Sequence, residues 1–255
     1  MEKLILITGA SSGLGEEFAF QLAAQGYSLL LVARRLERLQ HLQQKIAAEY
    51  PNIRLFCQRV DLTEQASGEQ ILDYINHEKL PLTGVINNAG FGQRGRFSDL
   101  PLSRQMEMLQ VNINSLVSLT HLMVPLLAQH QNSFIINVAS TAAFQPGPNL
   151  AIYYASKAFV LSFSQALYEE LKVQGIQVSA LCPGATNTEF IELANMPQTR
   201  LFKLRVMETK PVVHCALTNK NKAVVIPGFI NKISVFFIKI IPSSVARKLA
   251  YLIQK

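Results

Sequence analysis

Short apolar runs alternate with longer amphipathic segments along most of the chain. A brief apolar run bounded by Gly or Pro is typical of a buried strand, whereas apolar residues three and four apart predict a helix. We therefore predict seven strands, at 3–8, 28–33, 53–60, 84–89, 133–140, 176–182 and 222–227. Helices are predicted at 14–26, 35–49, 64–77, 103–129 and 152–173. Buried strands separated by helices indicate an α/β fold, a doubly wound, seven-stranded parallel sheet (Rossmann fold) with helices on both faces.

The chain continues for 28 residues after the last predicted strand, which ends at Pro227. Between residues 230 and 241, one helical stripe is apolar, and it consists of Ile230, Ile233, Phe237, Ile240 and Ile241. A second stripe follows at Val245, Leu249, Leu252 and Ile253. A chain of 255 residues can bury one large core. We therefore expect a single domain, 1–255, whose residues 228–255 form a C-terminal helical extension.

Charge is concentrated in the last quarter of the chain. Residues 200–255 contain eleven lysines and arginines against one acid, a net charge of +10, whereas residues 1–199 carry −3. Two explanations of the basic tail remain open. Its helices can pack on the sheet edge with their cations exposed, or an amphipathic tail with Arg247, Lys248 and Lys255 can touch anionic lipid. Nucleic acid is not expected as a partner, because neither base-stacking aromatics nor a groove-reading motif accompanies the charge.

Cysteine usage and apolar run lengths favour a cytoplasmic protein. Cys57, Cys182 and Cys215 are odd in number and widely spaced, so we expect reduced thiols. The five histidines show no metal-like spacing, and we expect no metal site. The N-terminal apolar run is too short for a signal peptide. The longest apolar stretch, ISVFFIKIIP, contains Lys239 and ends at Pro242, so it is too short to span a bilayer.

A glycine-rich loop, TGASSGLG, follows the first predicted strand and opens the first helix. Its glycines are Gly9, Gly13 and Gly15. In this context the backbone can approach a pyrophosphate, and the N–H groups of the helix N-terminus favour the anion. The alternative is a tight turn without a ligand. The G-x-x-x-G-x-G spacing differs from the commoner G-x-G-x-x-G, so the general fingerprint matches only in part.

The end of the second strand indicates which dinucleotide is bound. An acid about 20 residues after the loop would bind the ribose 2′-hydroxyl of NAD, but this chain has Arg34 and Arg35 there. Two guanidiniums suit the 2′-phosphate of NADP(H). The alternative is that both arginines are the solvated start of a helix.

The stretch AIYYASKAF offers two tyrosines and one lysine. Tyr153 lies four residues before Lys157, one helical turn away, whereas the corresponding partner of Tyr154 is Ala158. This spacing alone is common and does not identify a reacting centre.

Six motifs in a fixed order make the chain resemble the short-chain dehydrogenase/reductase family across about residues 3–190. They are TGASSGLG (8–15), DLT (61–63), NNAG (87–90), VNINS with Asn112, NVAS followed by YxxxK (137–157), and PGATNT (183–188). The resemblance implies a catalytic tetrad of Asn112, Ser140, Tyr153 and Lys157. It also implies cofactor contacts from Gly9, Ser11, Ser12, Gly13, Leu14, Gly15, Arg34, Arg35, Asp61, Leu62, Asn88, Ala89, Gly90, Tyr153, Lys157, Pro183, Gly184, Thr186 and Thr188. Many NADP-using members carry a basic residue where this chain has Ser12, so the NADP(H) prediction rests on the two arginines.

The chemistry of carbonyl reduction explains why these residue types are needed. A hydride donor on one side requires a proton donor at the developing alkoxide. Tyrosine titrates near ~10, and a cation such as Lys157 would have to lower that pKa by about three units, worth roughly 4 kcal/mol. By the resemblance, Lys157 also binds the nicotinamide ribose, Ser140 donates to the substrate oxygen, and Asn112 holds a relay water.

The sequence says less about the substrate and the oligomeric state than about the cofactor. Residues 185–215 are predicted to form a substrate lid that contains Phe190, Ile191, Leu193, Met196, Leu201 and Phe202. With TAAFQPG (141–147) beneath, they favour a hydrophobic ketone, aldehyde or alcohol, although they could simply pack the lid. The tail resembles those of bacterial hydroxysteroid- or ketoacyl-reductase-like members and would cap the edge where many members form tetramers, which leaves a homodimer open. The rival function is a non-catalytic NADP(H)-binding sensor on the same fold.

Overall fold

The computed structural model describes residues 3–190, 206–242, 244–245, 247–248 and 250. Seven strands form one sheet in the order β3-β2-β1-β4-β5-β6-β7, and every neighbouring pair is parallel. The strands are β1 (Leu4–Thr8), β2 (Ser28–Ala33), β3 (Leu55–Arg59), β4 (Leu82–Asn87), β5 (Ser133–Val138), β6 (Ile176–Leu181) and β7 (Val224–Val225). The predicted seven-stranded parallel sheet is confirmed, with β7 shorter than the predicted 222–227.

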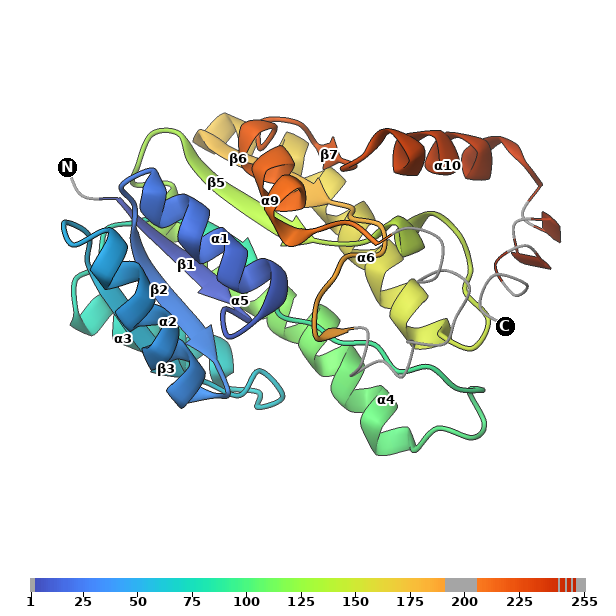
Figure 1. Cartoon of the computed structure of the whole chain (residues 1–255), viewed down its shortest axis with the longest axis horizontal. Helices are drawn as coiled ribbons and strands as arrows, with labels where there is room; N and C mark the ends of the chain where they lie inside the picture. The colour runs from blue at the N-terminus through green and yellow to red at the C-terminus, as the bar shows by residue number, and fades with distance from the viewer. Residues whose placement is uncertain (1–2, 191–205, 243, 246, 249, 251–255) are drawn as a thin grey trace.

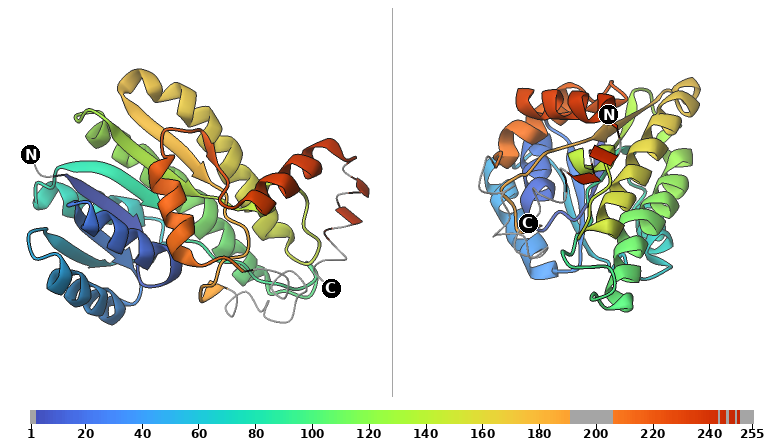
Figure 2. Two further views of the ribbon diagram at one scale, coloured as in Figure 1. Left: turned by 45° about the horizontal axis from the view of Figure 1, so that its top comes forward. Right: turned by 90° about the vertical axis from the view of Figure 1, so that its right-hand side faces the viewer.

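Helices cover both faces of the sheet, as Figures 1 and 2 show. One core contains side chains from α1 (Gly13–Ala24), α2 (Leu36–Glu49) and α9 (Thr209–Thr218). The opposite core contains side chains from α3 (Ser67–His77), α5 (Ser115–Leu127) and α6 (Ala151–Glu170). Residues of β1 alternate between these cores, because successive strand side chains point to opposite faces. Both faces of the sheet are therefore buried, which explains why the strands are continuous runs of apolar residues.

The strand order reverses between β1 and β4. The chain first adds β2 and β3 on one side of β1, then returns to add β4 on the other side. Open α/β sheets bind ligands at the carboxyl ends of the strands that flank such a reversal. The glycine loop after β1 and the NNAG motif at the end of β4 both lie there.

The predicted helix 103–129 is three segments. The helix α4 (Leu102–Leu109) continues into a π-helical turn, η1 (Gln110–Asn114), before α5 begins. A π turn inserts one extra residue and frequently occurs at functional sites. Here it contains Asn112, whose buried side chain receives a hydrogen bond from the Phe91 N–H (3.1 Å) and donates one to the Phe91 carbonyl (3.0 Å).

The C-terminal extension begins with α10 (Phe229–Ile240), which extends beyond β7 in Figure 1. Its protein-facing side holds Val235, which is buried, and Asn231, which donates to the Pro227 carbonyl at 2.8 Å. The predicted apolar stripe faces away from the protein; Ile230, Phe237 and Ile240 are more than half exposed. The prediction that this stripe packs on the sheet edge is therefore wrong. The helix contacts the rest of the protein through its opposite face.

The rest of the extension is described only in part. Val245 is exposed, as are Arg247 and Lys248, whereas Leu249, Leu252, Ile253 and Lys255 lie outside the described residues. No helix in the described ranges has both the length and the apolar character that crossing a bilayer requires.

Candidate active site

The glycine loop after β1 is shaped for close approach of its backbone. Gly9 and Gly13 have φ angles of 64° and 60°, a region that favours glycine. A Cβ on Gly15 would lie 2.2 Å from the Gly9 carbonyl oxygen, so only glycine fits. The loop ends in the first turn of α1, where Leu14 packs against the core. Exposed N–H groups at this helix start suit the pyrophosphate of a dinucleotide.

The NNAG motif braces the loop from β4. The side-chain amide of Asn88 donates to the carbonyls of Thr8 and Gly9 at 3.0 and 3.1 Å. The Ala89 N–H donates to the Thr8 hydroxyl at 3.1 Å. Asn88 and Ala89 thus hold together the carboxyl ends of β1 and β4.

Lys157 is buried beside the same motif. It is 6% exposed, and its Nζ donates to the Val138 carbonyl at 2.7 Å. A Cβ on Gly90 would lie 3.0 Å from Asn112 Oδ1 and 3.4 Å from Lys157 Nζ, so these three residues meet at one point. Burial lowers the pKa of Lys157 to about 8.

Tyr153 lies one helical turn from Lys157 and is hydrogen-bonded to Ser140. Burial raises the pKa of Tyr153 above its ordinary value, the Ser140 hydrogen bond opposes this, and the nearby Tyr154 adds to it. The predicted lowering of this pKa by Lys157 is therefore absent. The reason is geometric, because the Lys157 ammonium lies 5.9 Å from the centre of the Tyr153 ring and bonds to a backbone carbonyl.

Ser140 sits at the end of β5, where it caps the short helix η2 (Thr141–Phe144). Its hydroxyl accepts from the Ala142 N–H at 3.1 Å. The neighbouring Tyr154 is buried, and a Cβ on Gly147 would lie 2.3 Å from its ring. Tyr154 therefore packs against the 141–147 loop, while Tyr153 faces Ser140.

Apolar side chains surround Tyr153. Its ring centre lies 5.3 Å from that of Phe190, and a Cβ on Gly92 would lie 3.1 Å from the Tyr153 ring and 2.9 Å from the Phe190 ring. The other predicted lid residues, Ile191, Leu193, Met196, Leu201 and Phe202, lie outside the described residues. Residues 209–215 of the predicted lid instead belong to α9, which packs against α1 in the core. Apolar residues in that segment pack the helical layer of the sheet.

The PGATNT segment after β6 links α10 to the glycine loop. The Pro183 carbonyl accepts from the Thr141 N–H at 2.9 Å, and Thr186 donates to the Gly184 carbonyl at 3.0 Å. A Cβ on Gly184 would lie 2.6 Å from the Asn231 amide oxygen of α10. At the other end, the Thr188 methyl lies 2.9 Å from the position of a Cβ on Gly13.

The two arginines after β2 have different environments. Arg35 donates to the hydroxyls of Ser11 and Ser12, both at 3.2 Å, and so reaches the glycine loop. Arg34 is exposed, with no hydrogen bond or ion pair to any residue that the structure describes. Arg38 was not predicted as a site residue, but together with Arg35 it binds Glu189. Its position one helical turn after Arg35 is the sequence feature that could have indicated it.

Asp61 and Leu62 follow β3, at the same edge of the sheet. The Asp61 carboxylate accepts from the Thr63 N–H and hydroxyl at 3.0 and 2.9 Å, which closes a tight turn. Leu62 is buried in the core.

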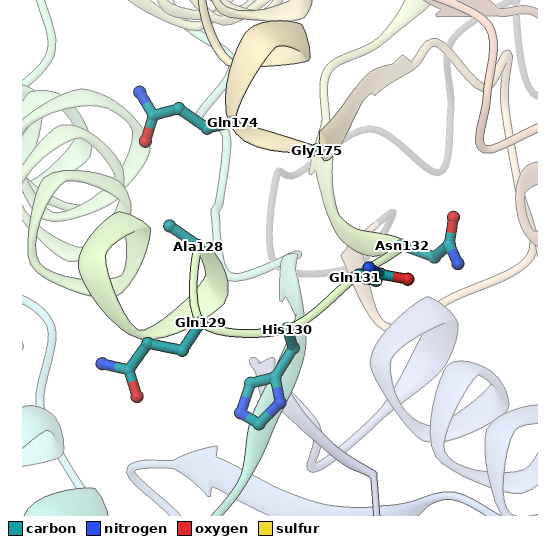
Figure 3. A pocket seen from close by; sticks show the side chains of 7 residues that line it. All are labelled: Ala128, Gln129, His130, Gln131, Asn132, Gln174 and Gly175. Carbon is teal, nitrogen blue, oxygen red and sulfur yellow. The ribbon is translucent and has the colours of Figure 1, made fainter.

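Other chemistry-bearing groups lie apart from this site or are buried. The three thiols are free, and burial raises the pKa of Cys182 to about 12 and that of Cys57 to about 11. Within the described ranges, no three histidine, cysteine or acidic residues converge on a metal position. A cavity of about 280 Å³ lies at the opposite end of the sheet, and its polar side chains point in different directions (Figure 3).

Comparisons with known proteins identify the family. The model of the short chain dehydrogenase family matches residues 3–198. Sulfoacetaldehyde reductase 2 of Chromohalobacter salexigens is 32% identical over 192 residues, 74% of this chain and 75% of that protein. This chain therefore belongs to the short-chain dehydrogenase/reductase family, and it is an oxidoreductase.

Two solved structures resemble most of the chain. A short-chain dehydrogenase from Sphingobium yanoikuyae in complex with NADPH has a TM-score of 0.82 and 31% identity, covering 94% of this chain and 96% of that chain. A bulky-bulky ketone specific alcohol dehydrogenase from Comamonas testosteroni has a TM-score of 0.77 and 29% identity, covering 94% and 95%. The likeness therefore extends beyond the family match at residue 198.

Proposed function

We propose that the protein is a cytoplasmic NADP(H)-dependent carbonyl reductase or secondary alcohol dehydrogenase acting on a hydrophobic ketone, aldehyde or alcohol. The observation that carries this proposal is the convergence of Ser140, Tyr153, Lys157 and Asn112 at the carboxyl end of the sheet, beside the glycine loop. Each residue has a definite task there.

The nicotinamide, when bound, supplies or accepts the hydride. Ser140 donates a hydrogen bond to the substrate oxygen, and Tyr153 transfers its phenolic proton to that oxygen as the alkoxide develops. Burial keeps Tyr153 protonated, as a proton donor must be. Lys157 holds the cofactor ribose, while Asn112 lies in the π turn beside it and holds a relay water.

The cofactor preference rests on Arg35. Its contacts with Ser11 and Ser12 put a cation against the loop that would bind the dinucleotide phosphates. We propose that Arg35 binds the 2′-phosphate directly and that Arg34 adds long-range attraction. The NADPH bound to the Sphingobium structure supports this choice.

Fluorescence titration of two variants tests this assignment. Arg35→Ala removes a charge-assisted contact and should weaken NADPH binding about ten- to a hundredfold, with little change for NADH. Arg34→Ala, the matched control, should have a smaller effect. Equal losses of NADPH and NADH binding in Arg35→Ala would contradict the phosphate role.

The substrate preference rests on the apolar surroundings of Tyr153. Phe190 covers its ring, and Ala142, Leu150 and Tyr154 form the adjoining cluster. The ketone preference named for the Comamonas enzyme supports a bulky apolar substrate. The name sulfoacetaldehyde reductase instead points to a small anionic aldehyde, so this substrate belongs in the test.

Turnover measurements test the enzyme against the sensor. Oxidation of NADPH is followed with bulky aliphatic and aromatic ketones, their aldehydes, and sulfoacetaldehyde. We expect the highest kcat/KM for the bulky ketones. Tight NADPH binding without turnover of any substrate would favour the non-catalytic sensor.

We also propose that the exposed face of α10 contacts an anionic lipid surface. The face consists of Phe229, Ile230, Ile233, Phe236, Phe237 and Ile240. Lys232 is exposed on the same helix, whereas the Lys239 ammonium lies over Phe144. The 228–255 segment contains five basic residues and no acid. Such a surface complements anionic lipid.

A further inference from the structure

The carboxylate of Glu189 is held between two arginines that belong to a distant part of the chain. Arg35 Nη2 donates to Glu189 Oε2 at 2.9 Å, and Arg38 Nη1 donates to Glu189 Oε1. Partial burial acts to raise the pKa of Glu189, but the hydrogen bonds and charges of Arg38 and Arg35 lower it below its ordinary value. The carboxylate is therefore firmly ionised.

This ion pair lies where the proposed 2′-phosphate of NADP(H) would bind. The same Nη2 of Arg35 donates to Ser11 and Ser12 of the glycine loop. The residue before Glu189 is Thr188, whose methyl group would lie 2.9 Å from a Cβ on Gly13 of that loop. The Glu189 carboxylate, an anion of the protein itself, therefore lies at the site proposed for the 2′-phosphate of the cofactor.

The donors of Arg35 are limited in number. One guanidinium Nη carries two N–H groups, yet Nη2 of Arg35 faces three acceptors, namely the two serine hydroxyls and the carboxylate. A phosphate monoester also accepts two hydrogen bonds from a guanidinium, and it is repelled by a carboxylate in contact with it. The phosphate and Glu189 cannot both use these donors.

We propose that Glu189 is an internal competitor of the adenosine 2′-phosphate, which lowers the affinity for NADP(H) and must leave Arg35 when that cofactor binds. NAD(H) has a hydroxyl in place of this phosphate, and it binds without displacing the carboxylate. Glu189 therefore sets the ratio between the two affinities. This inference rests on the proposed NADP(H) function.

Displacement has a structural consequence within the described residues. Glu189 and Thr188 belong to the PGATNT segment and its continuation, which begins beside Ser140. Release of the carboxylate from Arg35 and Arg38 frees the end of that segment from α2. Binding of the 2′-phosphate is thereby coupled to the segment that passes Tyr153.

Isothermal titration with cofactor fragments tests the competition without turnover. Full-length wild type, Glu189→Gln and the control Glu37→Gln are titrated with 2′,5′-ADP and 5′-AMP. Glu37 is an exposed acid on α2 without an ion pair to a described residue, so its replacement changes the local charge equally. Glu189 is partly exposed, so its amide variant should fold normally.

We expect Glu189→Gln to bind 2′,5′-ADP about three- to thirtyfold more tightly than wild type, because a partly screened charge-assisted contact no longer has to be displaced. Binding of 5′-AMP should change less than about twofold, as should both affinities of Glu37→Gln.

Unchanged or weaker binding of 2′,5′-ADP by Glu189→Gln would overturn the inference, since weaker binding means that Glu189 orients Arg35 for the phosphate. Wild type that binds 5′-AMP as tightly as 2′,5′-ADP would instead overturn the proposed NADP(H) preference. The two failures are distinct, because the first concerns the variant and the second the wild type.

Discussion

Tyr153 and Lys157 share one buried site, and burial favours the neutral form of both side chains. It raises the pKa of the phenol and lowers that of the ammonium to about 8. Neutral tyrosine is the form that donates a proton. Charged lysine, in contrast, is buried at a cost, which is partly offset by its hydrogen bond to the Val138 carbonyl.

Replacement of each tyrosine separates the two roles. Tyr153→Phe should lower kcat about 10²- to 10⁴-fold, the usual contribution of a positioned acid, with NADPH affinity nearly intact. Tyr154→Phe keeps the ring that packs on Gly147 and should lower kcat far less. Steady-state kinetics with the best ketone decide this, and the reverse ranking would show that Tyr154 is the acid.

Burial of Lys157 predicts a pH dependence of stability. The ordinary pKa of a lysine side chain is 10.5, whereas burial lowers that of Lys157 in the folded protein to about 8. Between these values the unfolded state binds more protons, so the free energy of unfolding gains from this group as pH rises. Below the pKa of Lys157 in the folded protein, the lysine is protonated in both states. The full free-energy cost of burying the ammonium is then present. A shift of this size corresponds to about 3 kcal/mol.

The measurement compares wild type with Lys157→Met by urea unfolding between about pH 7 and pH 10. The stability of wild type relative to this variant should increase by about 2.5 kcal/mol over that range. Buried Cys57 and Cys182 act in the opposite direction but are present in both proteins. Lys172→Met, at an exposed position, should show no such change. A flat difference for Lys157→Met would mean that the ammonium is well solvated.

At the scale of elements, close packing of strands on helices and on one another positions the site. The centre of the sheet has no space to spare at Gly84 of β4. A Cβ there would lie 2.6 Å from Ile5 Cδ1 and 2.8 Å from the Phe134 ring. The carboxyl ends of β1, β4 and β5, which hold the glycine loop, NNAG and Ser140, depend on this contact between their strands.

Gly84→Ala should therefore destabilise the protein by about 1–3 kcal/mol through overpacking. Ile5→Val removes the Cδ1 atom that the new methyl would meet. The double variant should be less destabilised than the sum of the single changes, with a coupling of at least about 0.5 kcal/mol. Urea unfolding of the four proteins measures it. Strict additivity would show that the strands adjust by moving apart.

At the scale of the whole molecule, the extension adds a face that the sheet does not use. The helix α10 is anchored at Gly184 and over Phe144, where the Lys239 ammonium lies 5.1 Å from the ring centre. Its inner side therefore borders the candidate active site, and its outer side is apolar. Under the proposed lipid contact, a lipid-like substrate would reach the site from the membrane surface.

Vesicle sedimentation tests the lipid contact. The full-length protein should sediment at low salt with vesicles containing phosphatidylglycerol, but not with phosphatidylcholine alone. Each basic residue near such a surface contributes about 1 kcal/mol, and salt should release the protein. Phe236→Ser with Phe237→Ser should reduce binding at least about tenfold, because both rings are exposed on the proposed face. Phe97→Ser, at another exposed ring, should not.

A different outcome would assign the face to a second copy of the chain. In that case the protein stays in the supernatant with both kinds of vesicle, and sedimentation equilibrium shows a dimer. The dimer would be lost in the Phe236→Ser, Phe237→Ser variant and kept in Phe97→Ser.

The sequence by itself determined the topology and the set of chemical groups. Apolar periodicity predicted the sheet because strands buried on both faces need continuous apolar runs. Motif order predicted that Ser140, Tyr153, Lys157 and Asn112 belong to one site, and the structure brings these residues together. Their catalytic roles remain predictions. Local spacing was informative because Tyr153 and Lys157 share one helix.

Only the tertiary structure decided which surfaces and charges meet. Periodicity identified the stripe on α10, but it could not tell which face of the helix finds a partner. The placement of 209–215 in α9 instead of a lid depends on packing against α1. The Glu189 contacts span 154 and 151 residues of sequence. Such pairs arise from the fold, because no local pattern relates an acid after β6 to arginines after β2.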